Sequence, residues 1–171
     1  MRFNRIAYPG LFIIFGKKRL MHIKIRTAQL QDRDAIAGFQ VEMAWETECY
    51  KLNHETVIKG VEAVLNNEKL GVYYVAMVGS EVVASLLTTY EWSDWRNGTV
   101  LWIQSVYVNR QFRKRGIYGT LYSHLKALVA ADETLKGIRL YVDESNKGAR
   151  EVYARLGMNG EHYRVFEWIK E

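Results

Sequence analysis

The sequence is poor in features that mark several classes of protein. It contains one cysteine, Cys49, and one proline, Pro9, among 171 residues. A single cysteine excludes an intramolecular disulfide and favours the reducing cytoplasm as the compartment. The four histidines lie without the spacing of metal ligands, so we expect no metal site. The apolar run at residues 11–15 is too short to span a membrane or to form the core of a signal peptide.

Acidic residues are absent from the first twenty positions, which carry five basic residues. Over the whole chain lysine and arginine number 24 and aspartate and glutamate 19, so residues 21–171 carry 19 of each sign. A near-neutral body argues against a nucleic-acid-binding protein, in which a basic face is expected. Because Met21 opens the patterned region, we expect residues 1–20 to be an N-terminal extension or appended segment, or the product of an upstream start assignment, with a short amphipathic or partner-binding arm as the less favoured interpretation. Residues 21–171 are expected to form one domain.

Hydrophobic periodicity in residues 21–171 predicts a mixed α/β domain. The expected strands are residues 22–27, 72–78, 82–90, 99–108, 137–142 and 161–169. The expected helices are residues 32–43, a helix with Asn53 as N-cap that ends before Gly71, a helix from Ile117, and a helix after Asn146. The order is therefore β-α-α-β-β-β-α-β-α-β, with helices flanking one central mixed, mostly antiparallel sheet.

A basic turn with two glycines follows the strand expected at residues 99–108. It consists of Arg113, Lys114, Arg115, Gly116, Ile117, Tyr118 and Gly119. Because the turn opens a helix, it offers unpaired backbone N–H groups at the positive end of the helix dipole. The glycines allow close approach of an anion, and the three basic side chains of the turn, together with Arg110 just before it, suit a ligand with several phosphates. The turn predicts a pyrophosphate site, and the alternative is a solvated basic patch.

A second motif places Asn146 after the strand at residues 137–142 and Tyr153 seven residues later. Seven residues are about two helical turns, so both side chains can address one ligand. Together the two motifs resemble the acetyl-CoA signature of the GNAT superfamily of N-acetyltransferases, over roughly residues 23–168. Arg113 and Gly116 match that signature. Tyr118 departs from it, because an aromatic replaces the usual small residue and Gly119 follows one place later.

The resemblance implies that acetyl-CoA is a co-substrate and that an acceptor amine attacks it directly. The basic turn and Asn146 would hold the cofactor, and the backbone of Val106 and Val108 would pair with its pantetheine arm and polarise the carbonyl. Tyr153, a phenol with a pKa of about 10, would donate a proton to the departing thiolate. The alternative for Tyr153 is a core position on its helix.

The acceptor site is predicted from acids and tryptophans in two segments. Glu91 is our first choice of general base, acting directly or through water, and Glu46 would bind a cationic acceptor. Trp45 and Trp92 would add an aromatic wall for an amine, although core packing also accounts for tryptophans and solvation for surface acids. We expect a small-molecule primary amine. The alternative acceptors are an amino acid, a protein N-terminus and a lysine. Another acyl donor and a homodimer are also possible, and the rival function is a non-catalytic acyl-CoA-binding or interaction module.

Overall fold

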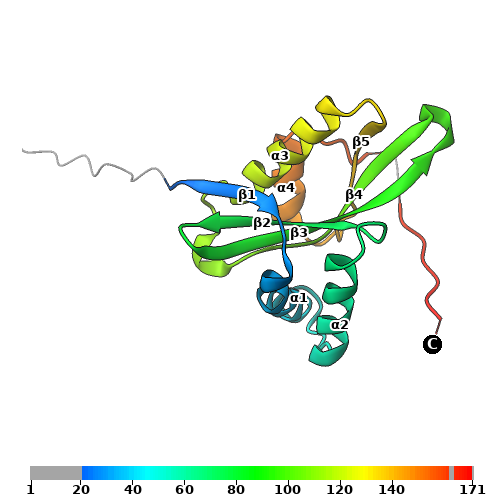
Figure 1. Cartoon of the computed structure of the whole chain (residues 1–171). Helices are drawn as coiled ribbons and strands as arrows, with labels where there is room; N and C mark the ends of the chain where they lie inside the picture. Colours follow the sequence, from blue (N-terminus) through cyan, green and yellow to red (C-terminus); the bar gives the residue numbers. More distant parts are fainter. Residues whose placement is uncertain (1–20, 162–163, 171) are drawn as a thin grey trace, which may run out of the picture.

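The computed structural model describes residues 21–161 and 164–170 (Figure 1). A five-stranded sheet in the order β1-β2-β3-β4-β5 forms its centre. Neighbouring strands are antiparallel from β1 to β4, and β5 joins β4 in parallel. The strands are β1 Ile23–Thr27, β2 Val72–Val78, β3 Glu81–Ser93, β4 Gly98–Val108 and β5 Leu135–Arg139. The structure confirms the predicted mixed, mostly antiparallel sheet.

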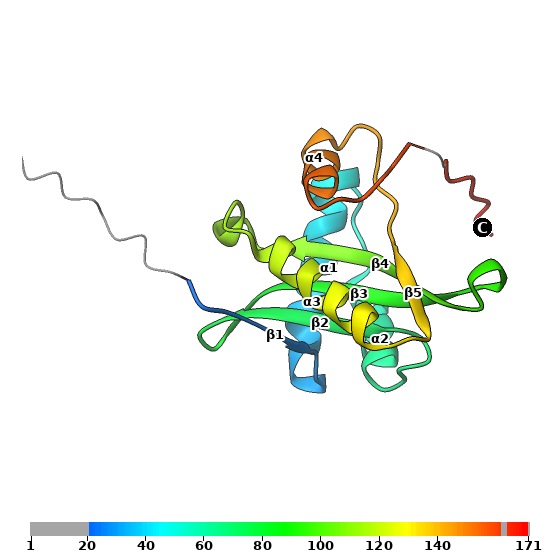
Figure 2. The same cartoon turned by 90° about the horizontal axis from the view of Figure 1, so that it is seen from above.

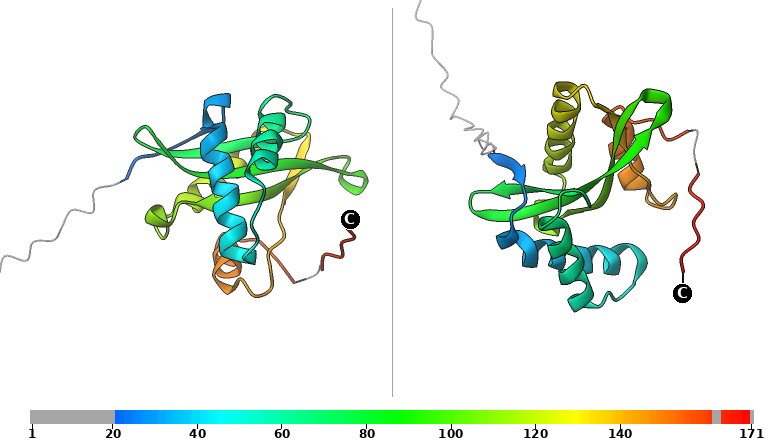
Figure 3. Two further views of the ribbon diagram at one scale, coloured as in Figure 1. Left: turned by 90° about the horizontal axis from the view of Figure 1, so that it is seen from below. Right: turned by 45° about the vertical axis from the view of Figure 1, so that its right-hand side comes forward.

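Helices cover both faces of this sheet. They are α1 Arg33–Glu48, α2 His54–Leu65, α3 Ile117–Ala131 and α4 Lys147–Arg155. Figure 2 shows α3 lying across one face, with α4 at the end of the connection that leaves β5. The left panel of Figure 3 shows α1 and α2 across the opposite face. The sheet is therefore the middle layer of three.

Two hydrophobic clusters fill the spaces between these layers. Leu86, Ile117 and Leu125 belong to the cluster on the α3 side, whereas Ile36 and Val75 belong to the cluster on the side of α1 and α2. Successive strand residues point to opposite faces, which is why Leu86 and its neighbour Leu87 enter different clusters. Each fully buried leucine or isoleucine contributes about 2 kcal/mol by leaving water.

The predicted helix boundaries are partly confirmed. The Asn53 side chain caps α2 by accepting a hydrogen bond from the Thr56 N–H at 2.9 Å. Helix α1 continues five residues beyond the predicted end at Met43 and closes at Cys49, whose φ of 52° is left-handed. The apolar pattern stops earlier than the helix because the last turns are largely exposed to solvent, where polar residues suffice.

Of the two strands predicted near the C-terminus, one is shifted and the other is wrong. β5 starts two residues before the predicted 137–142 and ends at Arg139, because its partner β4 pairs with it only this far. The final strand predicted at residues 161–169 is not formed in its described part, residues 161 and 164–169. Figure 3 draws residues 164–170 apart from the sheet, and Phe166 and Trp168 are exposed. Alternating apolar residues become a strand only where an edge pairs with them.

Three further predictions concern positions that the structure leaves undescribed. The appended segment at residues 1–20 lies outside the described residues, as do positions 162–163 of the predicted final strand and residue 171 of the predicted domain.

Gly71, just before β2, occupies a position where a larger residue is expected to destabilise the fold. Its φ is +148°, and an added Cβ would lie 2.5 Å from the Thr88 carbonyl oxygen and 2.9 Å from Leu87 Cδ1. We expect Gly71→Ala to lower the free energy of unfolding in urea by about 2 kcal/mol. Gly60→Ala is the control, because in α2 an added Cβ meets nothing within 4 Å. Equal stability of the two variants would contradict the expected clash.

Candidate active site

The sheet opens where β4 and β5 part. β5 pairs with β4 only over Thr99–Trp102, and β4 continues to Val108 while hydrogen-bonded to β3 on its other edge. Within the described residues no strand pairs with the β4 edge beyond Trp102. Ser105, with φ 51°, marks a bulge of one extra residue in β4 opposite the segment between Ser85 and Leu87 of β3. This edge offers backbone N–H and C=O groups to an extended ligand.

Val106 and Val108, predicted to pair with a pantetheine arm, lie on this open part of β4. Their side chains pack against the hydrophobic cluster on the α3 side. The valine side chains are thus used for packing, and only backbone groups remain for a ligand. The Val108 carbonyl already accepts a hydrogen bond from Arg113 Nε at 2.8 Å.

The basic turn that follows β4 contains two residues with left-handed backbone geometry. Lys114 has φ 61° and Gly116, the N-cap of α3, has φ 79°. The Thr120 N–H donates to the Gly116 carbonyl at 3.0 Å, so the N–H groups of Ile117, Tyr118 and Gly119 precede the first helical hydrogen bond. A Cβ added to Gly116 would meet nothing within 4 Å. Open space beside Gly116 and three N–H groups without a helical partner together suit a phosphate group.

The basic side chains of the turn differ in the contacts that they make with the rest of the protein. Arg113 forms an ion pair with Glu46 of α1 at 2.7 Å and lies over the Tyr107 ring, 5.1 Å from its centroid. The Arg115 guanidinium lies 5.5 Å from the centroid of the Phe112 ring. Lys114 and Arg115 are exposed. Of the four basic side chains predicted around the phosphate site, Arg110 and Arg113 form ion pairs with Glu46.

Glu46 connects α1 to the end of β4 and to the basic turn. Its Oε1 accepts from Arg110 Nε at 2.6 Å and lies 2.8 Å from the Tyr107 hydroxyl, which also lies 2.5 Å from Glu42 Oε2. Burial by itself would raise the pKa of the Glu46 carboxyl. The hydrogen bonds from Arg110, Tyr107 and Arg113 have a larger opposite effect together, so the pKa lies below its ordinary value. Burial and the two carboxylates raise the pKa of Tyr107.

A cleft of about 350 Å³ lies beside this network, between α1 and the short 3-10 turn η3, Arg110–Phe112. Its lining consists of Glu42, Trp45, Glu46, Asn109, Arg110 and Gln111. Trp45 and Glu46, both predicted to bind the acceptor, thus share one cleft on the α1 side of the sheet. Tyr153 and Glu91 do not line this cleft.

Tyr153 lies on α4 and packs against the first turn of α3. Its ring is 5.4 Å from the Tyr118 ring in an edge-on arrangement, and Tyr118 stacks on Tyr122 at 6.3 Å. Among the described residues the Tyr153 hydroxyl has no hydrogen-bond partner. Burial raises the pKa of this phenol above its ordinary value, so it carries its proton at neutral pH. Tyr153 thus has the protonation state that a general acid requires.

The departure of Tyr118 and Gly119 from the GNAT pattern has a packing consequence. The Tyr118 side chain packs against Tyr153, while its buried hydroxyl has no hydrogen-bond partner within residues 21–161 and 164–170. A Cβ added to Gly119 would lie 3.9 Å from Leu156 Cδ2, next to the end of α4. Asn146 caps α4, because its Oδ1 accepts from the Ala149 N–H at 3.0 Å. Asn146 therefore has a structural function in addition to its predicted contact with the cofactor.

Glu91, the predicted base, lies on β3 near the point where β4 and β5 part. Its carboxylate accepts hydrogen bonds from Trp102 Nε1 and from the Arg139 guanidinium. The Glu91 side chain is 32% exposed, and the Tyr141 ring lies 6.2 Å from the Trp102 ring. Along β4, the open edge therefore lies between the Glu91 group and the basic turn.

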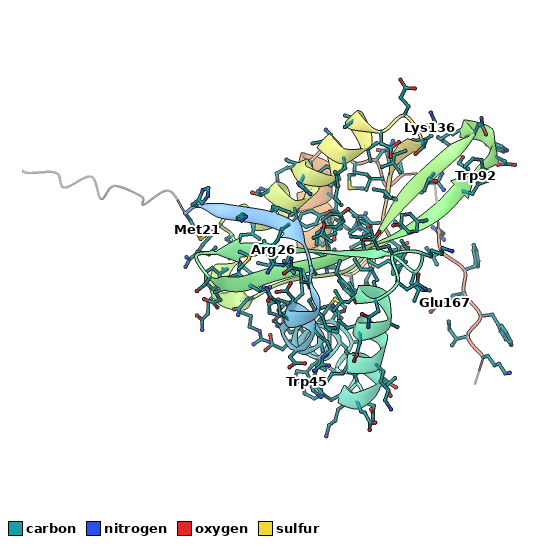
Figure 4. The ribbon with its side chains drawn as sticks, viewed as in Figure 1. Met21, Arg26, Trp45, Trp92, Lys136 and Glu167 are labelled. Carbon is teal, nitrogen blue, oxygen red and sulfur yellow. The ribbon has the colours of Figure 1, made fainter. Side chains whose placement is uncertain are left out.

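The structure does not gather the predicted acceptor residues into one wall. Figure 4 shows Trp92 at the end of the β3–β4 hairpin, far from Trp45 on the α1 side. Tyr107 and Arg139 were missed by sequence reasoning. Tyr107 resembles an ordinary alternating strand residue, and its carboxylate partners lie 61 and 65 residues away in the sequence. For Arg139 the sequence offers less evidence than for Tyr107, because it shows only that Arg139 lies on a predicted strand.

Two features are absent from the described residues. Residues 21–161 and 164–170 contain no group of three or more histidine, cysteine or acidic side chains placed to hold a metal ion. In the same ranges no helix is long and apolar enough to cross a membrane.

Comparison with known proteins identifies the class of this fold and site. Residues 27–158 match the acetyltransferase (GNAT) family, which is more than half of the chain. The protein therefore belongs to the GNAT family of acetyltransferases, which use acetyl-CoA. A "possible acetyltransferase" from Clostridium difficile 630 shares 43% sequence identity and a TM-score of 0.81 with it, over 87% of this chain and 98% of that chain.

More distant solved structures share the fold alone. The aminoglycoside N-acetyltransferase AAC(6')-Iy, in complex with CoA, has a TM-score of 0.71 at 16% identity, over 87% of this chain and 95% of that chain. The ribosomal-protein-alanine N-acetyltransferase of Brucella melitensis biovar Abortus 2308 has a TM-score of 0.71 at 15% identity, over 87% of this chain and 100% of that chain. No curated protein matches the sequence.

Proposed function

We propose that the protein transfers an acetyl group from acetyl-CoA to a primary amine by direct attack, with Tyr153 as general acid. The observation that carries this proposal is the open edge of β4, which runs from the Glu91 group into a turn that presents backbone N–H groups. An extended pantetheine arm fits a free strand edge, and a pyrophosphate fits the turn. One continuous path therefore suits the whole cofactor, with Asn146 contributing from the start of α4.

The chemistry assigns a separate task to each end of this path. The amine nitrogen attacks the thioester carbonyl carbon, the C–N bond forms, and the C–S bond breaks. A backbone N–H of the β4 edge polarises the carbonyl, and Tyr153 gives its proton to the departing thiolate. The amine loses one proton to Glu91, directly or through water. The electron pair of the broken C–S bond leaves with sulfur, which takes the Tyr153 proton and is released as the free CoA thiol.

Glu91 is proposed as the base because its carboxylate is held in place at the opening of the sheet. Trp102 and Arg139 donate to it from β4 and β5, the two strands that part there. Trp92 follows Glu91 on β3 and is 65% exposed, but successive strand residues point to opposite faces, so its indole would contact a cationic acceptor that extends around the hairpin. We therefore propose that the acceptor binds beside Glu91, and that Trp45 contacts only acceptors large enough to reach the α1 cleft.

The function is tested by following the release of free CoA thiol from acetyl-CoA with a panel of amines. The panel contains amino sugars, polyamines, amino acids, and peptides with a free N-terminus or lysine. Turnover on one class of acceptor is expected, and mass spectrometry of the product identifies the acetylated nitrogen. Binding of acetyl-CoA without turnover on any member would favour a non-catalytic acyl-CoA-binding module. Absence of CoA binding would refute the proposed cofactor path.

The single cysteine, which is free and exposed, supports a cytoplasmic location.

Glu91→Gln provides a specific test of the base. We expect it to lower kcat/KM for the acceptor about tenfold at neutral pH, because the glutamine amide cannot take a proton. The deficit should shrink as the pH rises through the pKa of the acceptor amine, where the free amine needs no base. Asp94→Asn, at an exposed acid of the same hairpin, is the matched control. A deficit that stays constant with pH would assign Glu91 a structural role through Trp102 and Arg139.

A further inference from the structure

The carboxylate of Glu46 is surrounded by donors that belong to the end of β4, to η3 and to the basic turn. Oε1 receives Arg110 Nε at 2.6 Å and the Tyr107 hydroxyl at 2.8 Å, and Oε2 receives an Arg113 nitrogen at 2.7 Å. Both oxygens are therefore engaged by protein groups. The side chain is only 15% exposed, although its two arginine partners are 67% and 41% exposed. This one acid anchors two arginines that are three residues apart.

The contacts of Arg113 extend this anchoring to the backbone of the turn. Its Nε donates to the Val108 carbonyl, the last residue of β4, and its guanidinium lies over the Tyr107 ring. Arg113 is followed by Lys114 and, two residues later, by Gly116, which have positive φ angles. The path of the backbone into α3 thus starts from a residue that Glu46 holds in place. A displaced Arg113 would redirect the N–H groups of Ile117 to Gly119.

We propose that Glu46 is a positioning residue for acetyl-CoA: through Arg110 and Arg113 it fixes the turn that binds the pyrophosphate. The inference rests on the proposed function, because it takes acetyl-CoA as the ligand of that turn. It differs from the sequence-based expectation that Glu46 binds a cationic acceptor. An acceptor ammonium would have to compete with two guanidinium groups already bound to the same carboxylate.

The discriminating experiment compares Glu46→Gln with Glu48→Gln. Both variants remove one negative charge from the C-terminal end of α1, but Glu48 is exposed. Isothermal titration gives the Kd for CoA, and steady-state kinetics give separate KM values for acetyl-CoA and for the acceptor. We expect Glu46→Gln to raise the Kd for CoA and the KM for acetyl-CoA about tenfold, because small displacements of a binding group are costly. The acceptor KM and the Glu48→Gln values should stay at the parent level.

Each outcome separates this inference from the proposed function. A raised acceptor KM with unchanged CoA affinity would overturn the positioning role and restore acceptor binding. Unchanged values for both ligands would also overturn it. CoA binding by the parent protein is measured in the same titration, so failure of the proposed cofactor path is recognised before any variant is compared.

A second variant guards against loss of the fold. Arg110→Gln removes one of the two bridges while Arg113 keeps its contact with Glu46. Because Arg110 is mostly exposed, its bridge is weaker, and we expect a rise of about threefold in the Kd for CoA. If Glu46→Gln fails to fold, as judged by circular dichroism, an unchanged Kd in Arg110→Gln would overturn the inference.

Discussion

Replacing Tyr153 by phenylalanine is expected to lower kcat about 100-fold near neutral pH, while the affinity for acetyl-CoA stays at the parent value. The phenyl ring keeps the edge-on packing against Tyr118, so α4 retains its place. Only the hydroxyl is lost, and no described residue hydrogen-bonds to it. The variant therefore removes a proton donor without breaking a hydrogen bond to any described residue, and its effect reports on the step in which the thiolate leaves.

The dependence of kcat on pH provides a second test of Tyr153→Phe. Burial raises the pKa of the Tyr153 phenol, so the parent keeps its proton donor up to a pH above the ordinary value of about 10. The alkaline fall in kcat that comes from this group should be absent in the phenylalanine variant. Tyr122→Phe is the control, because Tyr122 belongs to the same aromatic group and is given no part in the reaction. Parent-level kcat in Tyr153→Phe would reduce Tyr153 to a packing residue.

The local structures around the candidate site that sequence reasoning located correctly are those encoded by contiguous residues. The turn at residues 113–119 was predicted because a strand, two glycines and a helical pattern follow one another within a short segment. The structure places Gly116 at the N-cap of α3 with a left-handed φ. The same holds for Asn146, whose capping bond to Ala149 spans three residues. Local geometry of this kind depends on backbone preferences that the sequence carries directly.

The parts that it could not locate depend on contacts between distant segments. Arg110 meets Glu46 across 64 residues, and Arg139 meets Glu91 across 48. Nothing in the pattern around either acid distinguishes a paired carboxylate from a solvated one. The prediction of the final strand was wrong for a related reason. The alternation at residues 161–169 indicates a preference for extended structure, but it does not show whether a sheet edge is available to pair with it. Pairing is a property of the tertiary structure.

Asp32→Asn is expected to cost about 3 kcal/mol of unfolding free energy, because it breaks a buried and doubly hydrogen-bonded ion pair. Asp32 is 4% exposed and accepts from two Arg26 nitrogens at 2.6 and 2.9 Å. The Gln29 N–H adds a third bond at 2.7 Å. This pair joins β1 to the start of α1, and the asparagine would leave the Arg26 charge without its counterion in a partly buried place. Urea denaturation near neutral pH measures the loss.

The pH dependence identifies the ion pair as the source of that loss. The hydrogen bonds from Arg26 hold the pKa of Asp32 below its ordinary value despite the opposing effect of burial. A depressed pKa stabilises the fold above the unfolded value of about 4, and this contribution disappears as the pH falls through the folded value. The gap between parent and Asp32→Asn should therefore narrow below about pH 4. Asp34→Asn, at an acid that is 75% exposed, should cost at most about 0.5 kcal/mol. A gap that is independent of pH would mean that packing around Asp32, rather than its charge, holds β1 to α1.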